Sequence, residues 1–125
     1  MTRSILLGTE DLLRMAEHLG LAVRDVGLLA AAAARPTASA FGGDAYPGLA
    51  EKAAALMESL VRSHPLVDGN KRLGWLALVI TLDLNGVRLD VPDGEAVALT
   101  IGIAAGTAGL PEIVAALGRW HPSPA

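Results

Sequence analysis

The chain has 125 residues, a net charge of −3 and no cysteine, and about half of its residues are hydrophobic. This length fits a single domain over residues 1–125. The negative charge argues against direct binding to nucleic acid or to an anionic membrane surface. The lack of cysteine excludes disulfide bonds and thiolate catalysis, and it is compatible with a cytoplasmic location.

Two apolar runs, Leu73–Leu82 and Ala96–Leu110, are shorter than the roughly 18 residues that a membrane span requires. The apolar part of Met1–Gly8 is also shorter than the roughly 7–15 residues of a secretory signal. We therefore expect buried helices and no membrane association.

Helical patterns dominate the chain and predict an all-α bundle of about six helices, with its core over residues 9–118. The first three expected helices run from an N-cap at Thr9 to Gly20, from an N-cap at Asp25 to Pro36, and from near Pro47 past Leu60. The other three run from Asn70 to about Leu84, from about Glu95 to Ala105, and from Pro111 to about Gly118. Residues Trp120–Ala125 have the composition of a tail.

The fourth expected helix is apolar on all sides from Leu73 to Ile80. Such a helix is typical of a buried position, so we expect it to run through the middle of the domain. Residues Val87–Val91 could form a short extended piece after it, and either Asp90 or Asp93 could cap the next helix.

Residues 36–46 form a loop of small and turn-forming residues that contains the chain's single Phe and single Tyr. The simpler interpretation, which we favour from composition, is a surface loop anchored by its two aromatic residues. The functional interpretation is a flap that covers a site.

The segment His64–Arg72 concentrates the groups that chemistry on a phosphate ester requires. A helix start offers backbone N–H groups and partial positive charge, and the segment adds a histidine base, a carboxylate for Mg²⁺, and a cradle for anions. His64 is the candidate base, and Asp68 is the candidate carboxylate for Mg²⁺. The candidate anion-binding residues are Gly69, Asn70, Lys71 and Arg72.

Each of these residues also has an ordinary structural explanation. A histidine before a proline is usually a surface residue, and Asp68-Gly69 alone is a turn. Lys71 and Arg72, however, lie at the positive end of a helix, where cations are unfavourable unless an anion binds there. The histidines lack the spacing of a zinc site, and the common glycine-rich nucleotide motifs are absent from the sequence.

The segment His-Pro-Leu-Val-Asp-Gly-Asn-Lys-Arg at residues 64–72 resembles the motif H-x-F-x-[D/E]-G-N-[G/K]-R of the Fic/Doc family. Lys71 within it resembles the Doc, or "death on curing", branch, and Trp75 stands where longer Fic enzymes carry a second Arg. Similar text extends over residues 23–29, 41–47 and 49–54, so that the likeness covers roughly residues 9–118. The family's Phe is Leu66 in this chain.

This resemblance implies a Fic-type helical fold and a toxin of a toxin–antitoxin system. The implied activity is a protein kinase that uses ATP and Mg²⁺ to phosphorylate a Ser or Thr of a translation factor such as elongation factor Tu. His64 would be the base, Asp68 would hold Mg²⁺, and residues 69–72 would bind phosphates. A target-docking flap would include Phe41, Gly42, Gly43, Asp44 and Tyr46.

The resemblance leaves two alternatives to the kinase. One is an AMP transferase on the same site, which Lys71 disfavours because Gly-containing enzymes need that space. The other is a weakened binding module, favoured by Leu66 alone. The self-inhibitory string [S/T]-x-x-x-E-[G/N] does not occur in the sequence. Restraint would therefore come from a cognate Phd-like antitoxin whose disordered C-terminal segment folds onto the toxin.

Overall fold

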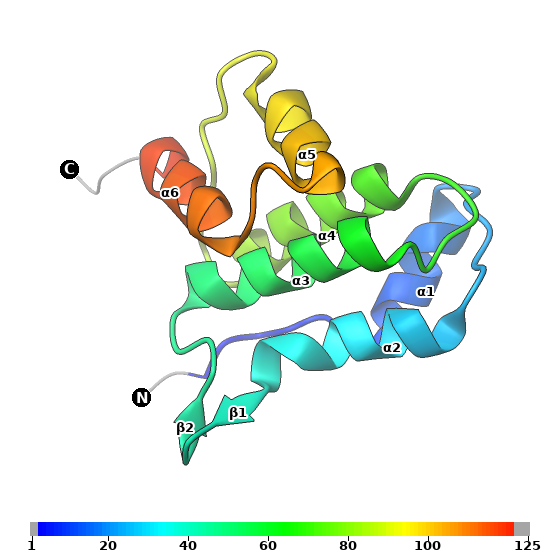
Figure 1. The fold of residues 1–125 in the computed structure, drawn as a ribbon, viewed down its shortest axis with the longest axis horizontal. Helices are drawn as coiled ribbons and strands as arrows, with labels where there is room; N and C mark the ends of the chain where they lie inside the picture. The colour runs from blue at the N-terminus through cyan, green and yellow to red at the C-terminus, as the bar shows by residue number, and fades with distance from the viewer. Residues whose placement is uncertain (1–2, 122–125) are drawn as a thin grey trace.

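The computed structural model describes residues 3–121, and six α-helices account for most of them (Figure 1). In chain order the elements are α1 (Thr9–His18), α2 (Val26–Ala34), the 3-10 helix η1 (Arg35–Thr37), β1 (Ser39–Ala40), β2 (Gly43–Asp44), α3 (Leu49–Ser63), α4 (Asn70–Leu84), α5 (Glu95–Ala105) and α6 (Leu110–Trp120). The strands β1 and β2 form a single antiparallel hairpin. The prediction of an all-α bundle is confirmed.

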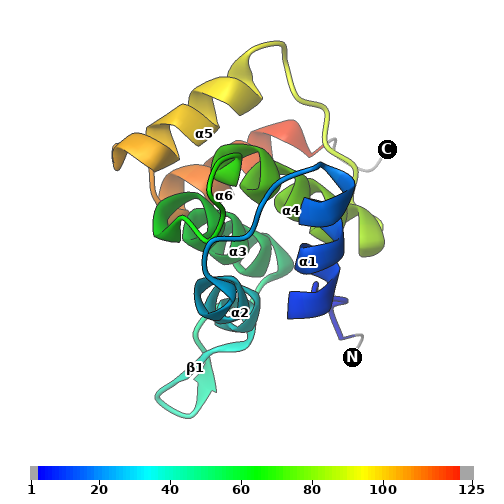
Figure 2. The ribbon, with the colours of Figure 1, turned by 90° about the vertical axis from the view of Figure 1, so that its right-hand side faces the viewer.

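Helix α3 is the central element, because α2, α4, α5, α6 and η1 all pack against it. Figures 1 and 2 show α2 on one side of α3 and the pair α5 and α6 on the other, and in Figure 1 α4 lies behind α3. The apolar run of α4 predicts that this helix runs through the middle of the domain, but α3 is the more central helix and several residues of α4 are only partly buried. The small residues Ala53, Ala54 and Ala55 let neighbouring elements approach α3 from several directions.

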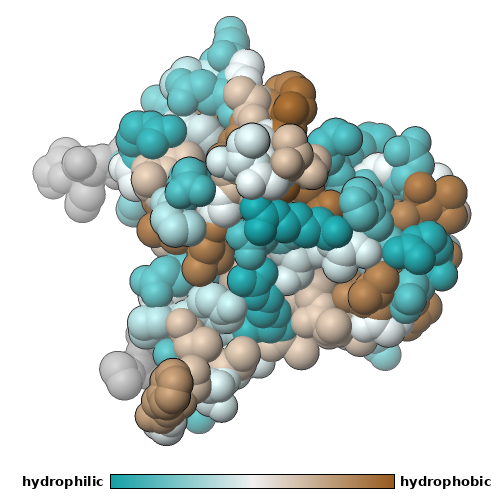
Figure 3. All heavy atoms as spheres, viewed as in Figure 1, coloured by the Kyte–Doolittle hydropathy of each residue, from teal (hydrophilic) through white to brown (hydrophobic). Residues whose placement is uncertain are grey.

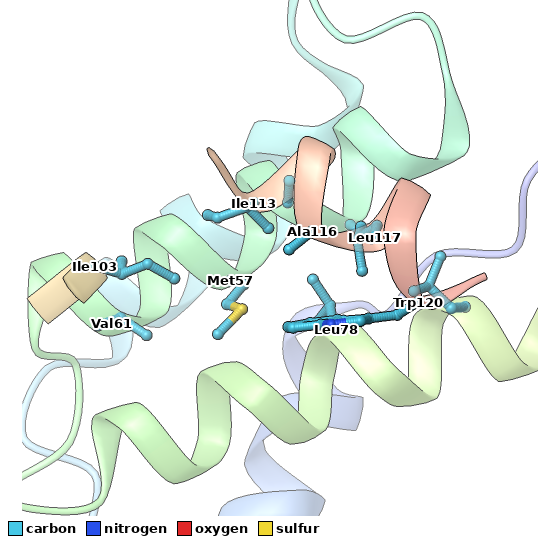
Figure 4. Packing of buried hydrophobic residues seen from close by; sticks show 11 residues of the cluster. Met57, Val61, Leu78, Ile103, Ile113, Ala116, Leu117 and Trp120 are labelled. Carbon is cyan, nitrogen blue, oxygen red and sulfur yellow. The ribbon is translucent and has the colours of Figure 1, made fainter. Parts of the chain in front are cut away.

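The core consists of two clusters on either side of α3 and α4. The first joins α3, α4, α5 and α6, and Figure 4 shows its main side chains, which are Met57, Val61, Leu78, Ile103, Ile113, Ala116, Leu117 and Trp120. The second joins α1 and α2 to α3 and α4 around Leu12, Leu29, Leu56, Leu60, Leu66 and Leu73.

Gly74 allows α3 and α4 to lie against each other. A Cβ atom at this position would stand 2.6 Å from a methyl carbon of Val61 and 3.3 Å from the carbonyl oxygen of Met57. Since both neighbours belong to the core of α3, any side chain here would push the two central helices apart.

Several local predictions need correction. Residues 36–46 contain η1 and the hairpin, and Phe41 at the hairpin tip is fully exposed rather than an anchor. Trp120 is buried at the end of α6 and packs edge-on against Trp75, so it is not part of a tail. The remaining predicted tail, residues 122–125, lies outside the described residues.

Helix termini were predicted with mixed success. The carboxylate of Asp25 accepts a hydrogen bond from the Leu28 backbone N–H, which confirms this N-cap. The N-caps of α1 and α5 are Gly8 and Gly94 rather than an adjacent Thr or Asp. Residues Val87–Val91 form no strand. Within residues 3–121, no helix combines the length and the apolar character that crossing a membrane requires.

Candidate active site

The predicted motif residues come together in one pocket at the junction of α3 and α4. The pocket has a volume of about 300 Å³. It is lined by His64, Val67, Asp68, Gly69, Asn70, Lys71, Arg72 and Ala104. Ala104 belongs to α5, so the end of that helix forms one wall of a pocket that is otherwise built from the motif itself.

His64 occupies the first position after α3 and has a left-handed backbone conformation, with φ of 55°. This conformation is uncommon for a residue with a side chain, and the surrounding structure must stabilise it. Two nitrogens of the Arg24 guanidinium group donate to the carbonyl oxygen of His64, Nε over 2.9 Å. The turn that presents the histidine is therefore held from outside the motif.

The rest of the motif loop pairs with the segment that connects α1 to α2. The backbone N–H groups of Arg24 and Asp25 both donate to the carbonyl oxygen of Pro65, and the N–H of Val67 donates to Ala22. Between these contacts the side chain of Leu66 is only 1% exposed and packs in the second core cluster. Leu66 thus anchors the loop in the core.

Asn70 holds the loop from its other end. Its side-chain oxygen accepts from the backbone N–H of Leu66 over 2.9 Å, and its side-chain nitrogen donates back to the Leu66 carbonyl over 3.1 Å. The same nitrogen lies 3.3 Å from Nδ1 of the His64 ring. Asn70 is buried, so its amide orients the loop and the imidazole ring rather than offering itself freely to a ligand.

Position 69 requires glycine for two reasons, its backbone conformation and a close neighbouring side chain. Its φ is 88°, in the left-handed region that favours glycine, and it forms the N-cap of α4. A Cβ atom here would stand 2.8 Å from both terminal methyl carbons of Leu21. Any side chain at this position would therefore have to displace Leu21 from the start of α4.

The start of α4 has the features of a phosphate-binding site. The first backbone N–H groups of a helix have no carbonyl partner within the helix and carry partial positive charge. The exposed side chains of Lys71 and Arg72 add two full charges at this end. An anion with several oxygens would satisfy both sets of donors.

Asp68 is the one carboxylate among the residues that line this pocket. One of its oxygens accepts from the Gly69 backbone N–H over 2.8 Å. Within residues 3–121, no three or more His, Asp or Glu side chains form a group that could hold a metal ion. The single carboxylate of Asp68 fits Mg²⁺, which commonly binds one or two carboxylates together with phosphate oxygens and water.

The predicted docking flap lies at the opposite end of α3 from the motif. The hairpin precedes the start of this 15-residue helix, which is about 22 Å long, whereas the motif follows its end. None of the predicted flap residues lines the motif pocket. Asp44 instead borders a second pocket near Lys52. A docking role for the hairpin stays a prediction.

A charged network centred on Glu58 of α3 joins η1 to the segment between α5 and α6. The carboxylate of Glu58 pairs with Arg35 over 2.8 Å and with Arg62 over 3.4 Å. Arg35 also donates to the Tyr46 hydroxyl over 2.9 Å, and Arg62 donates to the carbonyl oxygens of Ile103 and Ala108. Figure 3 shows hydrophilic atoms gathered over α3 in the middle of this face.

Arg35 stays charged within this network. Burial lowers the pKa of its guanidinium group, but hydrogen bonds to Tyr46 and Glu58 raise it more, so that the pKa lies above the usual value for arginine. The helical spacing of Glu58 and Arg62 indicated their pairing from sequence. No local pattern pointed to Arg35, or to the contact of Arg24 with His64, because these partners lie 23 and 40 residues apart.

Comparison with known proteins gives a family. The model of the "Fic/DOC family" matches residues 3–82, which is more than half of the chain. A protein named "Toxin Doc" from Mycolicibacterium smegmatis is 61% identical over 69 residues. That alignment covers 55% of this chain and 53% of the relative, so it spans about half of either protein.

Proposed function

Because the chain belongs to the Fic/Doc family, we propose that it is a toxin of a toxin–antitoxin system with the activity of a Doc-type protein kinase. In this proposal it transfers the γ-phosphoryl group of ATP to a Ser or Thr hydroxyl of a translation factor similar to elongation factor Tu, in the cytoplasm. One observation carries the proposal. A single pocket brings His64 and Asp68 together with the start of α4, where Lys71 and Arg72 lie.

The proposed reaction assigns a role to each side of the pocket. A ring nitrogen of His64 accepts the proton of the target hydroxyl group, while the oxygen of that hydroxyl group forms a bond to the γ-phosphorus. The bond from that phosphorus to the oxygen bridging it to the β-phosphate breaks, and ADP leaves. Residues Gly69, Asn70, Lys71 and Arg72 stand around the phosphate site, where backbone N–H groups and two cations stabilise the transferring charge.

Asp68 is the residue that would hold Mg²⁺. When bound there, the ion would offset the negative charge of the phosphate groups. The chain itself contributes the Asp68 carboxylate, which its hydrogen bond to Gly69 N–H fixes beside the helix start.

A cognate antitoxin completes the proposal. The name of the relative, Toxin Doc, supports a toxin role for this chain, and the sequence lacks the family's self-inhibitory string. We propose a Phd-like antitoxin with a disordered C-terminal segment that folds onto this chain and silences it.

Two features bear on the alternatives. Lys71 lines the pocket at the motif position where AMP-transferring enzymes of the family carry glycine, which favours phosphoryl transfer over AMP transfer. Leu66, the basis for a weakened binding module, is fully enclosed in the core and keeps the loop anchored. The burial of Leu66 therefore argues against the binding module.

Growth of a bacterial host upon induced expression, without any partner gene, tests the proposal. The unaltered chain should arrest growth, His64→Ala should abolish the arrest, and the matched control His18→Ala, on the exposed surface of α1, should keep it. Equal growth with all three soluble proteins would contradict the toxin proposal.

A further inference from the structure

Arg24 lies outside the motif, in the connection between α1 and α2, yet it contacts three successive residues around the end of α3. Its guanidinium group donates to the carbonyl oxygens of Ser63 and His64, and its backbone N–H donates to the carbonyl oxygen of Pro65 over 2.8 Å. The candidate base is therefore attached on its backbone side to a residue 40 positions earlier.

These contacts lie at the C-terminal end of α3. The last carbonyl groups of a helix have no partner within the helix and carry partial negative charge, so a cation is favourable there. His64 is the C-cap of α3 and has a left-handed conformation, so the helix ends at this residue. A planar guanidinium group with several donors in fixed geometry can hold two adjacent carbonyl oxygens at once, which the single ammonium group of lysine does less well.

We infer that Arg24 is a positioning residue for His64, an inference that rests on the proposed function of that histidine. Arg24 fixes the peptide that follows the Cα atom of His64, while Asn70 contacts the ring itself at Nδ1. With one restraint on the backbone and another on the ring, the imidazole keeps one orientation in the pocket. Arg24 does not line the pocket, so it acts through His64 and not on the substrate.

The loop has contacts that do not involve the Arg24 side chain. They are the backbone hydrogen bonds of residues 22–25 with Pro65 and Val67 and the buried side chain of Leu66, and we expect them to hold the loop when the guanidinium group is removed. We therefore expect removal of the guanidinium group to disturb the orientation of His64 without unfolding the loop.

Three variants test the inference. Arg24→Gln removes the cation and most of its donors, Arg24→Lys keeps the charge without the fork, and the matched control Arg88→Gln alters an exposed arginine whose only ion pair in the described residues, with Asp83, spans 3.9 Å. With ATP and a protein acceptor, Arg24→Gln should lower kcat about tenfold to a hundredfold and leave the KM for ATP within about twofold. Arg24→Lys should recover part of this loss, and Arg88→Gln should behave as the unaltered chain.

A measurement on the ring itself separates this inference from the proposed function. In NMR spectra, the unaltered chain should show a nuclear Overhauser contact between the His64 ring and the Asn70 side-chain amide, and Arg24→Gln should weaken it. This result would support positioning even if the unaltered chain transferred no phosphate, in which case only the proposed function would fail. An unchanged ring contact in Arg24→Gln would overturn the inference, as would an unchanged kcat in an active protein.

Discussion

Replacement of Leu66 by Ala tests whether the motif loop is held by core packing. The Leu66 side chain is 1% exposed and contacts the cluster that joins α1 and α2 to the central helices. Removing buried methyl and methylene groups costs their transfer free energy and leaves a cavity, and Leu→Ala changes at such sites cost about 2–5 kcal/mol. We expect a loss of about 3 kcal/mol in the free energy of unfolding.

Urea unfolding followed by circular dichroism measures this loss, and thermal unfolding checks it. For a domain of this length, 3 kcal/mol corresponds to a decrease of roughly 10 °C in Tm. Leu84→Ala is the matched control, because Leu84 lies at the end of α4 with 46% of its surface exposed. The control should stay within about 0.5 kcal/mol of the unaltered chain.

A decrease of less than about 1 kcal/mol in the free energy of unfolding of Leu66→Ala would refute the reasoning, because truncating a fully buried leucine destabilises a protein by more than this unless the loop packs elsewhere. The opposite change, Leu66→Phe, introduces the family residue into a site already filled by leucine. It should cost about 1–3 kcal/mol through overpacking, and a gain in stability would show that the leucine leaves a void.

Further predictions concern the loop, the charged network and the hairpin. Gly69→Ala should cost about 1 kcal/mol more in urea unfolding than Gly86→Ala, because both residues have positive φ but only Gly69 faces a close neighbour, Leu21; equal losses would contradict this. Glu58→Gln should cost about 1–3 kcal/mol, since it leaves the partly buried Arg35 and the more exposed Arg62 without their carboxylate, and a neutral result in thermal unfolding would be inconsistent with the network. Phe41→Ser should leave Tm unchanged because the side chain is fully exposed, while lowering phosphate transfer to a protein target if the hairpin docks it; unaltered transfer would remove the docking role.

The sequence predicted those features that depend on local patterns. The bounds of α4 and α5, Asn70–Leu84 and Glu95–Ala105, agree with prediction because runs of apolar residues end at Gly86 and Gly106. The motif residues lie in one pocket because they are consecutive at a helix start, where any fold would keep them together.

Features that depend on distant contacts could not be predicted from local patterns. Which helix is most enclosed depends on how many neighbours pack against it, and the alanines of α3 gave a weaker signal than the apolar run of α4. The attachment of His64 to Arg24 and of Glu58 to Arg35 joins elements that the sequence separates. The exposure of Phe41 follows from the tight hairpin, which holds its tip away from the core.

Transfer of isotope from labelled ATP tests the central claim most directly. The purified chain would be incubated with Mg²⁺, elongation factor Tu and ATP labelled at either the γ- or the α-phosphorus, with His64→Ala as the control. We predict label on the acceptor protein from γ-labelled ATP alone, and a mass increase of about 80 Da, the size of one phosphoryl group. Label from α-labelled ATP would instead show AMP transfer, and equal labelling by His64→Ala would contradict the role of His64.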